Sequence, residues 1–326
     1  MLPNATVRCA VRNSRSFEDL ALLPLLLAAA GPQRTGTFVE LGGFTGEEGS
    51  QTWLLEKCFG WTGTLIEASP INFAAMQRAG RSARLVHAGV CRPAGQFTVA
   101  VGDSPCSVTG DVEFMTASFR RTFGMHHRRN TTVPCRPLMD LLADDASQEA
   151  TGIGPPEKYS GHHRPATLPR RTRLELGHQR SAMDVTFLSL DVEGAEEVVL
   201  RTIRTAPRFP FSVVLVEMNR EAGLQLTNST RHVLNLLKRA GLKQLPIGKV
   251  AGSDNALFAR PELGDPRLTI EPPQDAVAQV RRAVAASRPL SRYSAVPLSY
   301  MGGPVAFAKR AALGLLRAET RMHKFV

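Results

Sequence analysis

Three short apolar segments, each leading into an acid, constrain the fold of this chain more than any other feature. They are Thr37-Phe-Val-Glu, Gly63-Thr-Leu-Ile-Glu and Phe187-Leu-Ser-Leu-Asp, in that order along the chain. Such runs are typical of buried parallel strands, whose last residues emerge at the carboxyl edge of a sheet. Because ligands of open α/β sheets bind at that edge, we expect Glu40, Glu67 and Asp191 to converge on one crevice. This arrangement is more typical of an enzyme than of a scaffold.

Strand and helix patterns alternate through much of the sequence. Strands are expected at 37–41, 64–67, 84–87, 185–191, 213–217, 242–247 and 255–259, with helices at 20–30, 50–59, 69–79, 196–204 and 230–240. This alternation predicts right-handed βαβ units and one seven-stranded, mostly parallel sheet with helices on both faces. Residues 96–101 are expected to add an edge strand, 133–142 to form a short strand and a helix, and 119–132 show no clear period.

The domain organisation follows from where these patterns stop. We expect an extension at 1–16, an α/β domain at 17–262, and a basic extension rich in Pro and Arg at 263–326. Residues 144–182 lose the pattern and are rich in Gly, Pro, Ser, Arg and His, so we interpret them as a mobile surface insertion.

The charge balance limits the classes of partner. The chain carries 40 Lys and Arg against 29 Asp and Glu, a net charge of +11. Such a charge permits contact with nucleic acid or an anionic membrane surface. Aromatic residues are only 6% of the chain, which argues against stacking on nucleic-acid bases. The basic C-terminal extension suits an anionic surface instead.

The five cysteines and the hydrophobic segments bear on the compartment. Cys9, Cys58, Cys91, Cys106 and Cys135 show no C-x-x-C spacing, and buried thiols are the expectation, although one bridge stays open. No segment has the ~18 apolar residues that span a bilayer, and no clear signal peptide begins the chain. We expect a soluble chain, with the compartment open and the cytoplasm slightly favoured. The oligomeric state is not determined.

The first two motifs suggest a nucleoside ligand. Gly42 and Gly46 lie in the turn after the first strand, where glycine lets backbone approach a ligand closely. An acid at the strand tip, Glu40, suits an ammonium or hydroxyl group, and Glu67 at the next strand tip can accept both ribose hydroxyls of an adenosine. Together they fit S-adenosylmethionine. A plain tight turn and an ordinary exposed glutamate are the structural alternatives.

The third motif is the most specific of the three. Asp191-Val-Glu-Gly-Ala-Glu196 places three acids at a strand-to-helix junction, with Gly194 allowing a sharp turn. Glu196 at a helix N-terminus can be purely structural. Asp191 ends its strand where a transferred group should lie. Asp191, Glu193 and Glu196 could also bind a divalent cation through oxygen, although capping and substrate hydrogen bonds are an adequate alternative.

These segments resemble the FkbM family of S-adenosylmethionine-dependent methyltransferases, in a eukaryotic-type branch. The resemblance rests on Asp191–Glu196, on Leu54–Pro70 with Val86–Cys91, and on Val213–Glu217. It implies a Rossmann-like class I methyltransferase fold and O-methylation of a hydroxyl on a sugar or small molecule. Many family members have Asp-x-Gly-Ala-Asn-x-Gly at the first motif, where this chain has Gly43 and Phe44 in place of Ala and Asn.

The resemblance also assigns residues to roles. It carries Glu40, Gly42 and Gly46 to the methionine end of the cofactor, Glu67 to its ribose and His87 to the adenine. Ser69 is also expected among the residues that bind the cofactor. Our hypothesis is that Asp191 or Glu193 acts as base or orients the acceptor, because an attacking hydroxyl must lose a proton.

Several alternatives remain open at this stage. His126 and His127 are alternative bases from a lid, or a solvated pair. Glu217 either lines the acceptor pocket or bonds a neighbouring turn. A nicotinamide-dependent oxidoreductase is another alternative, but the G-x-G-x-x-G motif that binds its cofactor is missing here. A catalytically inactive methyltransferase-like protein, binding a partner through its basic insertion and tail, is the main alternative function.

Overall fold

The computed structural model describes residues 9–10, 13–15, 17–105, 107–143, 184–203, 208–218, 226–245 and 255–263. The predicted insertion at 144–182 and the C-terminal extension beyond 263 lie outside the described residues. Within the described ranges, no helix is both long and apolar enough to cross a membrane.

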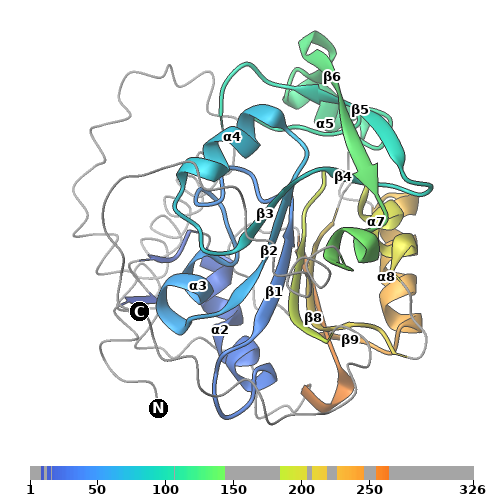
Figure 1. Ribbon diagram of the computed structural model, residues 1–326. Helices are drawn as coiled ribbons and strands as arrows, with labels where there is room; N and C mark the ends of the chain where they lie inside the picture. The colour runs from blue at the N-terminus through green and yellow to red at the C-terminus, as the bar shows by residue number, and fades with distance from the viewer. Residues whose placement is uncertain are drawn as a thin grey trace, which may run out of the picture.

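Seven strands form the central sheet (Figure 1). They are β1 (Thr37–Leu41), β2 (Thr62–Glu67), β3 (Arg84–His87), β7 (Val185–Leu190), β8 (Phe211–Glu217), β9 (Lys243–Leu245) and β10 (Asn255–Ala259). Their spatial order is β3-β2-β1-β7-β8-β10-β9. The first five run parallel, while β10 runs antiparallel to both of its neighbours. The predicted seven-stranded, mostly parallel sheet is confirmed, and this order is that of the Rossmann-like class I methyltransferase fold.

Helices cover both faces of this sheet, as predicted. One face packs against α2 (Phe17–Ala29), α3 (Trp53–Phe59) and α4 (Pro70–Arg78), and the other against α7 (Glu196–Thr202), α8 (Asn228–Arg239) and a helical stretch at 138–143. Consecutive side chains of β1 point to opposite faces of the sheet. Phe38 therefore packs in the core on the side of α2, α3 and α4, and Val39 packs in the core on the side of α7 and α8. Ser69 caps α4, and Pro70 lies in its first turn.

A second, three-stranded sheet stands at one end of the first (Figure 1). It consists of β4 (Gly89–Val90), β6 (Arg129–Arg136) and β5 (Gly95–Val101), with β6 in the middle. The expected edge strand at 96–101 is therefore present, but at the edge of this second sheet and not of the main one. The short alternating segment gave no information about its partner, and β6 begins with exposed polar residues that hid its period. The region 119–132 is likewise ordered, by α5 (Ala117–Thr122), the short 3-10 helix η1 (Met125–His127) and the start of β6.

Two disulfides correct the prediction of buried thiols. Cys9 bonds to Cys58 on α3, and Cys91 bonds to Cys135 on β6. The Cα atoms of each pair lie 5.8 and 5.5 Å apart, within the usual range for a disulfide. The pairs are 49 and 44 residues apart in sequence, so no local spacing signal could have indicated them.

Gly42 supports the closest backbone approach in the site region and gives a test of the fold. It has φ of +75°, and a Cβ there would lie 1.8 Å from the Asp191 carbonyl oxygen. Gly49 has a similar φ of +68°, but a Cβ there would have nothing within 4 Å.

We expect Gly49→Ala to lower the free energy of unfolding by about 1–2 kcal/mol from backbone strain alone. Gly42→Ala should cost several times more in denaturant unfolding, and equal costs would contradict the close approach.

Candidate functional site

Four acids at the carboxyl ends of neighbouring strands lie on the same side of the sheet. Strand alternation explains this. Glu40, Glu67 and Glu217 each follow a side chain of the core that faces α3 by two residues: Phe38, Leu65 and Leu215. Asp191 follows Phe187 of the same core by four residues. The parallel registers Leu41↔Leu190 and Leu190↔Val216 bring these strand ends together. The predicted convergence of acids on one edge follows from this register.

A pocket opens at this edge, between the sheet and the turn before α3. Its lining consists of Glu40, Leu41, Gly42, Gly49, Gln51, Ser189, Leu190, Asp191, Leu215, Glu217 and Asn255. Of the site residues predicted from sequence, the lining includes Glu40, Gly42 and Asp191. Gln51 and Asn255 were not predicted, because a loop amide and an antiparallel strand carry no motif. Both side chains donate to Glu18 of α2, at 3.0 and 2.7 Å.

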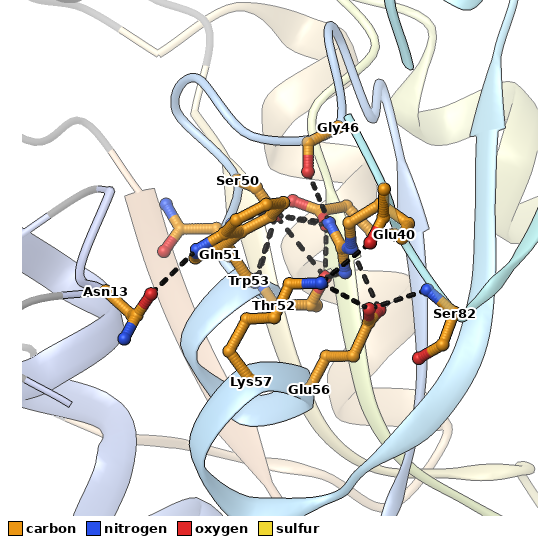
Figure 2. Close-up of polar contacts among 12 residues, drawn as sticks. Asn13, Glu40, Gly46, Ser50, Gln51, Thr52, Trp53, Glu56, Lys57 and Ser82 are labelled. Atoms are coloured by element: carbon orange, nitrogen blue, oxygen red, sulfur yellow. Dashed lines mark hydrogen bonds and ion pairs between the residues drawn. The ribbon is translucent and has the colours of Figure 1, made fainter. Parts of the chain in front are cut away.

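Glu40 is held by the turn that precedes α3 (Figure 2). Its carboxylate accepts hydrogen bonds from Ser50 Oγ at 2.9 Å, from Gln51 N at 2.8 Å and from the Thr52 hydroxyl. The side chain is buried. Glu40 therefore organises the wall of the pocket, in addition to lining it.

The same turn is fastened from its other side by the guanidinium of Arg81. Arg81 donates to Gly46 O at 2.6 Å, Ser50 Oγ at 3.1 Å and Thr52 Oγ1 at 2.9 Å. It also pairs with Glu56 of α3 at 2.9 Å, and neither side chain is exposed by more than 3%. Burial alone would raise the pKa of Glu56, but hydrogen bonds from Ser82 and Arg81 outweigh it and hold that pKa below its ordinary value. Figure 2 shows Ser50 and Thr52 on the turn before α3 and Glu56 on the helix itself.

Glu67 links the first two βα turns. Its two carboxylate oxygens accept from Phe44 N at 2.8 Å and Ser69 N at 2.7 Å. Burial raises the pKa of Glu67 to about 7, against the lowering effect of those two amides. The Asn72 side chain adds a third hydrogen bond. A carboxylate offers about four lone-pair positions, so one remains for a ligand. Gly46, with φ of +78°, closes the first turn through Gly46 N to Gly43 O at 2.8 Å.

Ser69 and His87 lie beside Glu67. Ser69 accepts from Asn72 N at 3.3 Å as the N-cap of α4, so its hydroxyl is engaged in the helix. His87 stacks on Phe73 with ring centroids 4.9 Å apart, and its Nε2 lies 3.2 Å from Ala68 O. The stacked pair forms a flat surface next to the end of β2.

The turn between β7 and α7 separates the roles of its three acids. Glu196 is buried, and one of its oxygens accepts from Val192 N and Gly194 N, each at 3.1 Å. Its role is therefore to hold the turn. Glu193 takes φ of 58°, an uncommon backbone state for a residue other than glycine. A Cβ on Gly194 would lie 2.2 Å from Phe114 O, so the loop before α5 packs directly on this turn.

Asp191, Glu193 and Glu217 form a tight cluster. Each offers a carboxylate oxygen, and these oxygens lie within 4.8 Å of one another. Solvent reaches Asp191 through the pocket, yet the protein surrounds it on its other sides, and this desolvation raises the pKa of Asp191 to about 6. Burial, then the charges of neighbouring acids, raise the pKa values of Glu193 and Glu217 well above their ordinary range.

The structure thus changes the composition of the predicted acid trio. Glu217 takes the place beside Asp191 and Glu193 that the sequence suggested for Glu196. Register explains this, because Glu217 follows Val216 on the neighbouring strand just as Asp191 follows Leu190. His126 and His127 lie exposed on η1.

Comparisons with known proteins add little to this geometry. No protein-family model matches the chain, and no curated protein matches it. Among solved structures, a TehB-like SAM-dependent methyltransferase from Corynebacterium glutamicum is 14% identical, over 74% of this chain and 87% of that one, with a TM-score of 0.31.

Two further solved structures resemble the chain at similar distance. Fibrillarin from Aeropyrum pernix, in complex with natively bound S-adenosyl-L-methionine, is 10% identical over 68% of this chain and 65% of its own, with a TM-score of 0.31. The mitomycin 7-O-methyltransferase MmcR is 13% identical over 74% and 54%, with a TM-score of 0.25. Similarity at these TM-scores does not indicate a function. The function is inferred from the strand order and the geometry of the site.

Arg81 offers a direct test of how the pocket wall is held. Removing one partner of a buried ion pair leaves the other charge uncompensated, so Arg81→Met should lower the free energy of unfolding by about 3–5 kcal/mol. Arg201 pairs with Glu197 in an i,i+4 contact, but its side chain is 59% exposed. The matched variant Arg201→Met should therefore change stability by at most about 1 kcal/mol. Denaturant unfolding of both variants measures the difference, and a small effect at Arg81 would contradict its structural role.

Proposed function

We propose that this chain is an S-adenosylmethionine-dependent methyltransferase. The observation that carries the proposal is the set of acids on one face at the carboxyl edge of a class I methyltransferase sheet, beside a pocket after β1. Ligands of open α/β sheets bind at this edge. Glu67 at the end of β2 keeps a free lone-pair position for a ribose hydroxyl, and the acidic pocket suits a cofactor that carries sulfonium and ammonium charges.

The finer proposal is membership of the FkbM family and transfer of the methyl group to a hydroxyl of a sugar or small molecule. In that reaction a bond forms between the acceptor oxygen and the methyl carbon. The bond between that carbon and the sulfonium sulfur breaks, its electron pair stays on sulfur, and the hydroxyl proton passes to a carboxylate. Asp191, which lines the pocket, and Glu193, whose carboxylate lies close to it, are the candidates to receive the proton or orient the acceptor.

A catalytically inactive binding protein remains the second candidate, and one observation favours it. Glu40 and Glu67 already accept hydrogen bonds from within the chain, and Phe44 stands where many family members have Asn. In this case the basic tail would contact an anionic partner surface.

The disulfides support a different compartment from the one the sequence slightly favoured. Structural disulfides form and persist where the surroundings are oxidising, and they are rare in the cytosol. We therefore propose that the chain folds in an oxidising compartment.

Alkylation of the denatured, unreduced chain should modify one of its five cysteines, since four are paired. Five modified cysteines in protein purified from its native source would contradict the proposal.

Calorimetric titration with S-adenosylmethionine and S-adenosylhomocysteine tests the proposed cofactor. We expect micromolar binding of both, and a loss of roughly tenfold or more in Glu67→Ala, because hydrogen bonds to a charged group contribute about 1.5–3 kcal/mol. Glu48 is an exposed acid of the first turn and gives a matched control, so Glu48→Ala should bind normally.

The result separates the two candidate functions. Absence of binding by the folded wild-type chain would overturn the enzyme proposal and favour the binding protein. If binding is found, an acceptor screen with labelled methyl groups follows. Near-normal turnover in both Asp191→Asn and Glu193→Gln would then rule out their role in handling the proton or orienting the acceptor.

A further inference from the structure

We propose that Asp191, Glu193 and Glu217 bind a divalent cation that in turn holds the methyl acceptor through its oxygens. This inference rests on the proposed function for its catalytic meaning, but the binding of the ion can be measured by itself. It assigns Glu217 to a functional role and removes Glu196 from the set of ligands, since one Glu196 oxygen accepts from Val192 N and Gly194 N and holds the turn.

Two buried, unpartnered oxygens point to a ligand at this cluster. Glu193 Oε2 and Glu217 Oε2 are inaccessible to solvent and have no hydrogen-bond partner within the described part of the chain. Buried carboxylate oxygens are normally hydrogen-bonded, paired with a cation or coordinated to a metal. These two oxygens belong to the very residues whose carboxylates meet Asp191.

Within the part of the chain that the structure describes, no basic side chain takes the place of the ion. Among the ion pairs of the described residues, none includes Asp191, Glu193 or Glu217. The other groups that act on Asp191 are acids as well: Glu217 shares a side-chain hydrogen bond with it, and the charges of Glu18 and Glu40 raise its pKa. Carboxylates crowded together in this way repel one another unless positive charge is brought between them.

The spacing of the oxygens fits a hard cation. Ca²⁺ binds oxygen at about 2.3–2.6 Å, so ligands on opposite sides of it lie about 4.6–5.2 Å apart. The cluster oxygens all lie within 4.8 Å of one another, so none is too far from the others to share such an ion. Mg²⁺, with about 2.0–2.1 Å to each oxygen, would place opposite ligands about 4.0–4.2 Å apart. All-oxygen carboxylate ligands select such ions over zinc or copper.

The position of the cluster indicates the class of acceptor. Three carboxylates fill part of a coordination shell of six to eight oxygens, and Asp191 and Glu217 open onto the pocket. An acceptor with two neighbouring oxygens, such as a vicinal diol of a sugar or a hydroxy acid, can occupy adjacent open positions. An ion held by Asp191, Glu193 and Glu217 would lower the pKa of a bound hydroxyl and fix its position toward the methyl group. With the ion bound, Asp191 and Glu193 would have the second of their two proposed roles, that of orienting the acceptor.

The experiment titrates metal-stripped, full-length protein with Mg²⁺, Ca²⁺ and Mn²⁺ by calorimetry, with Mn²⁺ binding followed by electron paramagnetic resonance. We expect one ion per chain at this site, and weakening of at least about tenfold in Glu217→Gln and in Glu193→Gln. Two variants are used so that the result does not depend on the folding of one. Glu197→Gln is the matched control, because Glu197 pairs with Arg201 and His232 on the surface and should not affect the ion.

A parallel titration with S-adenosylmethionine in the presence of chelator keeps this inference separate from the proposed function. Cofactor binding that persists without metal, together with metal binding that persists with cofactor, supports the proposal. Lack of saturable metal binding, or equal affinity in the cluster variants, would overturn it. Mutually exclusive binding of ion and cofactor would also overturn it, because the carboxylates would then serve the positive charge of the cofactor.

Discussion

The buried guanidinium of Arg81 is the interaction on which the pocket depends. It reaches from the segment after α4 to the turn before α3 and joins Gly46, Ser50 and Thr52 to Glu56. Ser50 and Thr52 in turn hold Glu40. A charge without solvent contact is tolerated only when it is paired and hydrogen-bonded throughout, so the turn has little freedom to rearrange. The pocket wall is rigid for the same reason that Arg81 can be buried.

Buried acids occur in two different electrostatic surroundings in this chain, beside Arg81 and in the cluster of Asp191, Glu193 and Glu217. At the α3 turn, a buried acid meets a buried base and its pKa falls below the ordinary value. At the ends of β7 and β8, the acids lie close to other acids, and burial together with these charges raises their pKa values. Perturbed acids of the second kind in a cleft are typical of functional sites, because the unfavourable charge is retained for a ligand. This contrast supports assigning structural duty to Glu56 and ligand binding to Asp191, Glu193 and Glu217.

The errors in the sequence-based prediction have a common physical origin. The strands of the main sheet were predictable because a strand buried on both faces is apolar along its whole length. The sheet to which residues 96–101 belong was not predictable, because alternation shows that a strand exists and not which strand pairs with it. The disulfides join segments more than 40 residues apart. Glu196 was grouped with Asp191 and Glu193 because it is near in sequence, while the β7–β8 register brings Glu217 closer in space.

The sequence by itself therefore determined the class of fold, the order of its strands and helices, and the edge at which the acids gather. These properties follow from local hydrophobic patterns and from the rule that parallel strands present their carboxyl ends together. Only the tertiary structure decided which acids touch. Contact between side chains depends on strand register, on backbone conformation at Gly42 and Glu193, and on the buried Arg81, which holds the turn before α3. None of these is encoded in a single segment, because each requires two or more distant parts of the chain to pack together.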